Sequence, residues 1–264
     1  MSLSKKQIKE LSDFAGEMAL GAGKILKDGF NKIHQVKLKG RIDPVTEADL
    51  NSERHIVSFI NKRYSEHNIL AEEGSGNGEE AEFRWIIDPL DGTVNYAHGF
   101  PIYCVSIALE YKGKMLLGAV YDPERDELFH AARGMGSYLN KKKIHVSKET
   151  NLERALLATG FSYTVGTDKK NNLGLFARMV KKAQAVRRPG SAAIDLCWLA
   201  AGRIDGFWEL YLHPWDTAAA LVILEEAGGK ATRINGNPYS IFNDDILAGN
   251  SRLHKAMKAV LTNK

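Results

Sequence analysis

The chain has 264 residues, of which 44% are hydrophobic and 26% charged, a balance typical of a globular protein with a buried core. Its net charge is only +4 and the basic residues are spread along the chain, so the composition does not indicate a nucleic-acid-binding protein. No apolar run reaches the roughly 18 residues that a membrane-spanning helix requires, and two cysteines are too few for a disulfide framework.

Two long amphipathic helices are predicted at the N-terminus. From about Ser4 to Lys27, apolar side chains recur at steps of three and four residues and form one stripe. Gly29 stands where this helix would end. A second helix is predicted from Thr46 to about Tyr64, with a buried stripe formed by Leu50, Ile56, Phe59 and Ile60.

The middle of the chain is rich in predicted strands. Short apolar runs predict strands at residues 68–71, 84–87, 105–111, 115–121, 127–132 and 137–139. Lys112-Gly113 is a hairpin signal between two of these runs. The glycine-rich stretch from Gly74 to Glu80 follows a pair of acids, so we predict a mobile loop beside an active site.

Helices and strands alternate in the C-terminal part of the chain. The patterns predict strands at residues 155–159, 185–188 and 206–209, and helices at residues 171–182, 191–201, 216–227 and 251–261. Together with the antiparallel strands in the middle, this alternation predicts a layered fold of the α+β or α/β class.

The most informative segment is Asp-Pro-Leu-Asp-Gly-Thr at residues 88–93, which directly follows an apolar strand. The proline removes a backbone donor and ends the strand ladder, so the chain turns where Asp88 and Asp91 lie and both carboxylates can point to one side. Gly92 lets backbone N–H groups approach a ligand and Thr93 adds a hydroxyl, an arrangement that suits a phosphate. Either aspartate alone would also fit an ordinary turn.

Two further acids stand at similar positions in the sequence. Glu72 follows an apolar run and Asp216 opens a helix. Carboxylates at such places are the hard oxygen ligands that Mg²⁺ prefers, and four of them in one cleft would repel each other unless cations neutralised them. Spacing alone does not bring them together, because Asp216 also fits a helix N-cap and Glu72 a solvated strand end.

Residues 69–106 and 215–229 resemble the two signatures of the inositol monophosphatase family of lithium-sensitive phosphatases. Residues 45–49 and 190–196 resemble two further family segments, in the expected order and spacing. Three positions depart from the usual family residues without removing a metal ligand, and they concern loop stiffness or substrate fit: Pro44, Ala71 and Ala220.

The resemblance implies an α+β fold, a layered αβαβα sandwich of the sugar-phosphatase type. It implies that residues 1–264 form a single catalytic unit with the site between two halves. We place an N-terminal α+β half at residues 1–145 and a C-terminal α/β half at residues 146–264.

The resemblance also implies a metal site. Glu72, Asp88 and the backbone carbonyl of Leu90 would hold a first Mg²⁺. Asp88, Asp91 and Asp216 would hold a second, so that Asp88 bridges the two. A weaker third ion near Glu72 and substitution by Mn²⁺ are further expectations.

Catalytic groups follow from the same resemblance. A water on the metal beside Glu72 would be the nucleophile, and the hydroxyl of Thr93, paired with Asp49, would orient it and help to deprotonate it. Asp49 also fits a capping box with Thr46, and the two roles are compatible. The backbone N–H groups of Gly92 and Thr93 would bind the phosphate.

Other residues are expected to bind the substrate. Glu209 and the amide of Ala192 would contact its sugar or cyclitol hydroxyls, and Asp91 is a further substrate-binding residue. Ser162 is expected nearby, and Lys39 resembles a basic residue of a mobile N-terminal loop that completes the site.

The expected reaction is hydrolysis of a small phosphomonoester, with inositol 1-phosphate as the first candidate. Fructose 1,6-bisphosphate, NADP or a 3′-phosphoadenosine nucleotide are alternative substrates with the same mechanism. A regulatory or binding protein on this fold, without turnover, is the alternative from another class. The intact set of acids and Thr93 argues against that alternative.

The remaining expectations concern location and partners. The N-terminal residues show no apolar segment of a signal peptide, and Cys104 and Cys197 lie in apolar runs, so we expect reduced thiols in a cytoplasmic protein. The resemblance implies a homodimer, and neither nucleic acid nor membrane is expected as a partner. His98 and His213 lack metal-ligand spacing and are expected to be structural or to lie behind the site.

Overall fold

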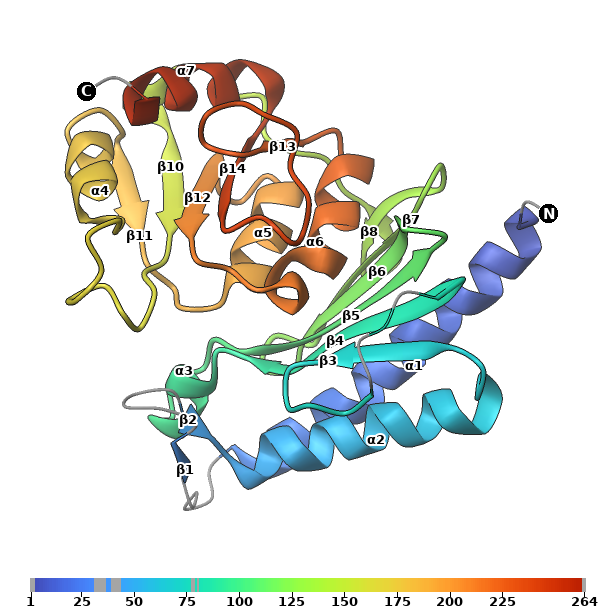
Figure 1. Ribbon diagram of the computed structural model, residues 1–264. Helices are drawn as coiled ribbons and strands as arrows, with labels where there is room; N and C mark the ends of the chain where they lie inside the picture. The colour runs from blue at the N-terminus through green and yellow to red at the C-terminus, as the bar shows by residue number, and fades with distance from the viewer. Residues whose placement is uncertain (1–2, 31–36, 39–43, 77–78, 80, 263–264) are drawn as a thin grey trace.

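The computed structural model describes residues 3–30, 37–38, 44–76, 79 and 81–262, and Lys39 lies outside these residues. Helices and sheets alternate in five layers, which confirms the αβαβα sandwich (Figure 1). None of the helices in the described part of the chain has the length and the apolar run that crossing a membrane demands.

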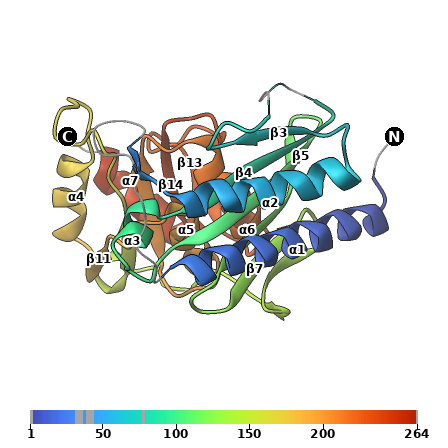
Figure 2. The ribbon, with the colours of Figure 1, turned by 90° about the horizontal axis from the view of Figure 1, so that it is seen from below.

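Two long helices form the first layer: α1 (Lys5–Gly29) and α2 (Glu47–Arg63). They lie side by side across one face of the larger sheet (Figure 2). The ends of α1 agree with the prediction, because Ser4 forms a capping box with Gln7 and the helix ends at Gly29. A separate short pair of strands, β1 (Lys37–Leu38) and β2 (Pro44–Val45), precedes α2.

The larger sheet has seven strands that follow one another in sequence order. They are β3 (Asn68–Ala71), β4 (Phe83–Asp91), β5 (Cys104–Tyr111), β6 (Lys114–Asp122), β7 (Glu127–Ala132), β8 (Gly136–Leu139) and β9 (Lys142–Lys143). All neighbours are antiparallel except β3 and β4, which are parallel. Parallel strands end at the same edge of a sheet, so Glu72 after β3 and the two aspartates of β4 share that edge.

The smaller sheet has five strands in the order β11-β10-β12-β14-β13. Their bounds are β10 (Leu156–Thr159), β11 (Ala185–Arg187), β12 (Gly206–Leu210), β13 (Lys230–Thr232) and β14 (Asp245–Gly249). The strand β10 is parallel to both β11 and β12, so the carboxyl ends of these three strands also share an edge. A short 3₁₀ helix, Leu152–Arg154, precedes β10.

Two helices fill the space between the sheets: α5 (Ala192–Ala200) and α6 (Pro214–Glu226) (Figure 1). Their side chains form one apolar core with the inner faces of both sheets. The helix α6 lies tightly against β6, since a Cβ atom on Gly118 would come within 2.2 Å of the Ala219 carbonyl oxygen. The outer face of the smaller sheet is covered by α4 (Leu173–Val180) and α7 (Ser251–Thr262).

The structure corrects several details of the sequence-based prediction. The strand β4 does not end at Pro89 but continues to Asp91 after an irregularity in its pairing with β5. The strands β13 and β14 and the short helix α3 (Thr93–Ala97) were not predicted. In α2, Phe59 is 40% exposed and Leu50 is only half-buried, because much of the inward face is polar.

Candidate active site

A cavity of about 290 Å³ opens where the strand ends of both sheets meet the first turns of α5 and α6. Its walls include ten of the residues that the sequence singled out: Glu72, Asp88, Leu90, Asp91, Gly92, Thr93, Ser162, Ala192, Glu209 and Asp216. Asp49 lies outside the cavity wall, behind Thr93. The chain therefore brings together acids from four separate segments.

The two aspartates of β4 lie on either side of the irregular pairing. Asp88 pairs with Ser106 of β5, Asp91 pairs with Cys104, and the residues between them bulge out of the ladder. The Leu90 N–H donates to Oδ1 of Asp88 over 3.0 Å. The chain therefore turns at this bulge, as the proline indicated, and the strand pairing resumes at Asp91.

Gly92 allows the chain to leave β4 and start α3 at once. Its φ is +97°, and a Cβ atom there would lie 2.9 Å from the Ile102 carbonyl oxygen. Only glycine adopts such a backbone without strain. Thr93 is thereby placed as the first residue of α3, with its hydroxyl 3.0 Å from the Leu90 carbonyl oxygen.

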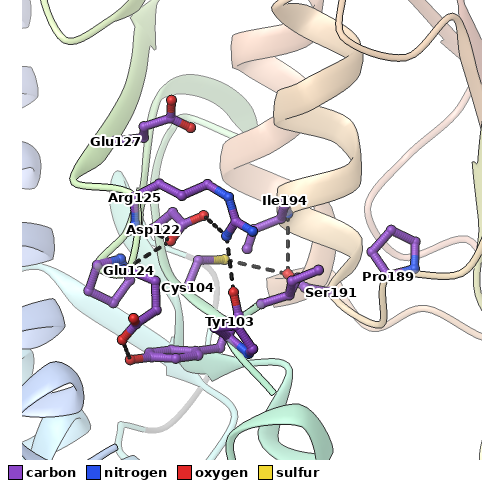
Figure 3. A network of polar contacts seen from close by, with 12 residues as sticks. Tyr103, Cys104, Asp122, Glu124, Arg125, Glu127, Pro189, Ser191 and Ile194 are labelled. Atoms are coloured by element: carbon purple, nitrogen blue, oxygen red, sulfur yellow. Dashed lines mark hydrogen bonds and ion pairs between the residues drawn. The ribbon is translucent and has the colours of Figure 1, made fainter. Parts of the chain in front are cut away.

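Asp91, at the end of β4, is held by hydrogen bonds from the start of α5. These bonds connect the two walls of the cavity. Oδ2 of Asp91 accepts hydrogen bonds from the Ser191 hydroxyl and the Ala193 N–H, both over 2.7 Å. Ser191 is the N-cap of α5, and its hydroxyl oxygen lies 3.7 Å from the sulfur of Cys104. Figure 3 shows the two side chains pointing toward each other. Burial raises the pKa of Asp91 to about 6, although these hydrogen bonds oppose the rise.

Asp216 is the third residue of α6 rather than its N-cap. The N-cap is His213, whose backbone N–H donates to Oδ2 of Asp216 over 2.7 Å, and Pro214 is the first helical residue. His213 stacks on Trp215 and lines the cavity, whereas His98 is exposed at the end of α3 and does not.

The electrostatics of the cavity acids favour a bound cation. Burial raises the pKa of Asp88 well above its usual value, and the charges of Glu72, Asp91 and Asp216 raise it further. Burial, followed by the charge of Asp91, does the same for Asp216. No lysine or arginine is among the main influences on the pKa of these three aspartates.

These carboxylates fit the oxygen-donor set of Mg²⁺. Among the described residues, no group of three or more His, Cys, Asp or Glu side chains is arranged as it stands to hold a metal ion. The fit therefore rests on the shared cavity, the mutual repulsion and the neutral donors that hold one oxygen of Asp88, Asp91 and Asp216.

Thr93 and Asp49 form the pair that the sequence predicted. The Thr93 hydroxyl lies 3.3 Å from Oδ1 of Asp49, and Oδ2 of Asp49 accepts the N–H of Thr46 over 2.8 Å. The capping box and the contact to Thr93 coexist, as expected. Burial raises the pKa of Asp49 to about 6, while hydrogen bonds from Thr46 oppose the rise.

The opposite wall carries Glu209, at the end of β12, and Ala192, the first residue of α5. A Cβ atom on Gly160 would lie 2.1 Å from Oε1 of Glu209, so this glycine makes the space that the carboxylate occupies. Burial raises the pKa of Glu209 to about 8, the Asp91 charge adds to the rise, and Arg188 opposes it.

Several residues of the cavity were missed from the sequence. Arg188 and Asp195 line the wall near Glu209, and Tyr211 lines its edge in a left-handed backbone conformation. Asp195 is buried, and its Oδ1 accepts no hydrogen bond within the described residues. For Arg188, the turn signal Arg188-Pro189-Gly190 after a predicted strand was a local indication that it lies in a loop.

The chain is similar over nearly its whole length to proteins of known family. Residues 7–264 match the model of the inositol monophosphatase family. Inositol-1-monophosphatase from Synechocystis sp. is 42% identical, over 98% of this chain and 91% of the relative. Fructose-1,6-bisphosphatase/inositol-1-monophosphatase from Aquifex aeolicus is 40% identical over 94% of each chain. Nus factor SuhB from Pseudomonas aeruginosa is 38% identical over 95% of each chain. The structure of inositol monophosphatase from Anabaena superposes with a TM-score of 0.88 at 40% identity, covering 96% of this chain and 95% of that one.

Proposed function

Because the chain belongs to the inositol monophosphatase family, we propose that it hydrolyses inositol 1-phosphate to inositol and phosphate with Mg²⁺ as cofactor. Family membership and the named relatives make the chain a phosphomonoesterase that acts on a small phosphorylated substrate. The observation that carries the finer proposal is the gathering of four carboxylates in one cavity wall, three of them without an ion pair among the described residues.

The proposed cofactor sites follow from the cavity wall. Glu72, Asp88 and the Leu90 carbonyl would hold one Mg²⁺, and Asp88, Asp91 and Asp216 would hold another, with a weaker third ion near Glu72 and Mn²⁺ as a substitute. Bound Mg²⁺ lowers the pKa of water and neutralises charge on the transferring phosphoryl group.

Thr93 and Asp49 are proposed to orient and deprotonate the attacking water. When the Thr93 hydroxyl donates to Asp49, its oxygen is left to accept a hydrogen bond from water in the cavity. Asp49 is buried and already tied to Thr46, so the pair enters the reaction in a fixed orientation. Positioning of this kind is what phosphoryl transfer chiefly needs from a protein.

Substrate binding is proposed to use both walls of the cavity. The backbone N–H groups of Gly92 and Thr93 would bind the phosphate beside Asp91. Glu209 and the amide of Ala192, on the opposite wall, would bind the hydroxyl groups of the polyol. The two walls together recognise a compact polyol carrying one phosphate.

Other substrates keep the same mechanism. Fructose 1,6-bisphosphate is the second candidate, because Arg188 lines the cavity near Glu209 and offers a cation for a second phosphate. NADP and 3′-phosphoadenosine nucleotides are further alternatives. A binding or regulatory protein without turnover remains the alternative from another class.

The proposal extends to the setting of the enzyme. We propose a cytoplasmic homodimer, inhibited by lithium, without nucleic-acid or membrane partners. Cys104 and Cys197, buried and unpaired in the structure, are consistent with a reducing compartment.

The test is a phosphate-release assay on the purified protein with inositol 1-phosphate, fructose 1,6-bisphosphate, NADP and a generic phosphomonoester. Each substrate is assayed with Mg²⁺ and with a chelator. We expect Mg²⁺-dependent release with the highest kcat/KM for inositol 1-phosphate. Glu209→Ala should lower that value about tenfold and leave the generic ester nearly unchanged. Absence of Mg²⁺-dependent release from every substrate would support the binding-protein alternative.

A further inference from the structure

The inward face of α2 is polar at the point where it meets the active-site loops. Ser52 and Glu53 follow Asp49 by three and four residues, so both lie on the same face of the helix as Asp49. All three are at most 3% exposed. Helix positions of this kind normally carry apolar side chains, so each of these polar side chains needs a partner.

Two of the three side chains contact the segment that runs from β4 into α3, and the third contacts the loop after β3. Asp49 lies against Thr93, and the Ser52 hydroxyl donates to the Pro89 carbonyl oxygen over 2.8 Å. Of these three side chains, only Glu53 forms hydrogen bonds with the loop that follows β3. One face of α2 therefore holds two segments of the cavity wall, the end of β4 with the start of α3 and the loop after β3.

Glu53 uses both carboxylate oxygens on the loop after β3. Its Oε2 accepts the backbone N–H of Glu73 over 3.0 Å, and its Oε1 accepts that of Ser75 over 3.2 Å. Between these residues lies Gly74, with φ at +93°. The two N–H groups thus converge on a single carboxylate, as the amides of a nest converge on an anion.

The two hydrogen bonds to the loop explain why the Glu53 carboxylate is buried at this position. A fully buried glutamate is rare unless it is paired, and among the described residues no lysine or arginine forms an ion pair with Glu53. Hydrogen bonds to an ionised acceptor are roughly twice as strong as neutral ones. The turn at residues 73–75 is therefore anchored to α2 by two such bonds.

We propose that Glu53 is a positioning residue of the active site, which fixes the turn at residues 73–75 and thereby holds the carboxylate of Glu72 in the cavity wall. Glu72 is directly attached to this turn, and its own N–H donates to the Ile87 carbonyl oxygen over 3.2 Å. The backbone of Glu72 is thus held from β4 on one side and from Glu53 on the other. The inference rests on the proposed role of Glu72 as a metal ligand.

The decisive variant is Glu53→Gln, which keeps the shape and one oxygen acceptor but removes the charge. Glu66→Gln is the matched control, because that glutamate lies just beyond α2 and is 74% exposed. Gly74→Ala weakens the same turn from the other side, since nothing lies within 4 Å of the added methyl group but the backbone conformation is unfavourable for alanine.

Amide hydrogen exchange on the metal-free proteins gives the first readout. In Glu53→Gln we expect exchange in residues 72–76 to accelerate about tenfold, with residues 84–88 of β4 unchanged and Glu66→Gln like the parent. Unchanged exchange in residues 72–76 would overturn the proposal. This readout does not depend on activity, so it stands even if the parent protein shows no Mg²⁺-dependent phosphate release and the proposed function fails.

The dependence of phosphate release on Mg²⁺ gives the second readout. Glu53→Gln and Gly74→Ala should each raise the half-activating Mg²⁺ concentration about tenfold, while kcat at saturating Mg²⁺ stays within about threefold of the parent. A lower Tm with an unchanged half-activating concentration would show a purely structural role and overturn the proposal. If Glu53→Gln does not fold, the same criterion applied to Gly74→Ala decides the question.

Discussion

Buried carboxylates in this protein occur in two kinds of surroundings. Glu110 and Asp122, which lie away from the cavity, face arginines: Glu110 lies 2.6 Å from Arg84, and Asp122 lies 2.9 Å from Arg125, a pair drawn in Figure 3. In the cavity, Asp88, Asp91 and Asp216 form no ion pair with any described residue, and they accept hydrogen bonds from backbone N–H groups, the Ser191 hydroxyl and the Cys104 thiol. Carboxylates are thus paired with a cation of the chain in one region and left without one in the other.

The difference separates structural from functional acids. A buried ion pair is a closed unit whose charges cancel within the fold. Burial raises the pKa of Asp122 as well, but Arg125 opposes the rise, whereas the neighbours of Asp88 add to it. Acids that repel each other in a shared cavity lower stability by themselves, and we propose that a cation from solution neutralises them.

The largest effect is expected for Asp91→Asn, which removes one charge from the cavity set. Asparagine keeps an oxygen for Ser191 and Ala193, so the fold should persist. Loss of a metal-binding charge is expected to lower kcat/KM about 10³-fold, with Tm of the metal-free protein equal to or above that of the parent. Near-normal turnover, measured by phosphate release, would contradict the assignment.

The opposite outcome is expected for Glu110→Gln, the matched change in the paired region. The variant removes the charge that faces Arg84, so the free energy of unfolding should fall by about 3 kcal/mol. Turnover of the folded fraction should stay at the parental level, because the pair lies outside the cavity wall. Urea unfolding measures the change in stability, and phosphate release from the same preparation measures turnover. A variant as stable as the parent but without activity would contradict the assignment of Glu110 to a structural ion pair.

A smaller effect concerns Glu209, whose folded-state pKa is about 8 against an ordinary value of 4.5. Protonation favours the folded state, so this contribution to stability is complete below pH 4.5 and is lost as the pH rises through about 8. Without metal, the unfolding free energy of the parent should therefore fall relative to Glu209→Gln by about 1 kcal/mol per pH unit between pH 5 and 8. If the unfolding free energies of the two proteins changed in parallel with pH, the pKa of Glu209 would not be raised in the folded state.

Much of the fold could be predicted from local sequence signals, whereas the gathering of the site carboxylates was implied only by the family resemblance. The carboxylates of the first wall stand at strand ends followed by proline or glycine, and each such signal is contained within a few residues. The strands β13 and β14 were missed because their stability comes from pairing with each other and with β12, which no local pattern records.

The polar contacts that complete the site were not predictable in the same way. The bond from Ser191 to Asp91 joins residues 100 positions apart. In α2, Ile56 and Ile60 of the predicted stripe are buried, but the buried Ser52 and Glu53 were not predicted, because a periodic pattern does not show which polar residues are buried. The residues missed are those whose partners lie on another element.

The most direct test of the central idea is a crystal structure of the protein grown with Mn²⁺, with an anomalous difference map recorded at the manganese edge. We expect manganese peaks bounded by Glu72, Asp88, Asp91 and Asp216. A map without a peak in this cavity, at a Mn²⁺ concentration that supports phosphate release, would contradict the account.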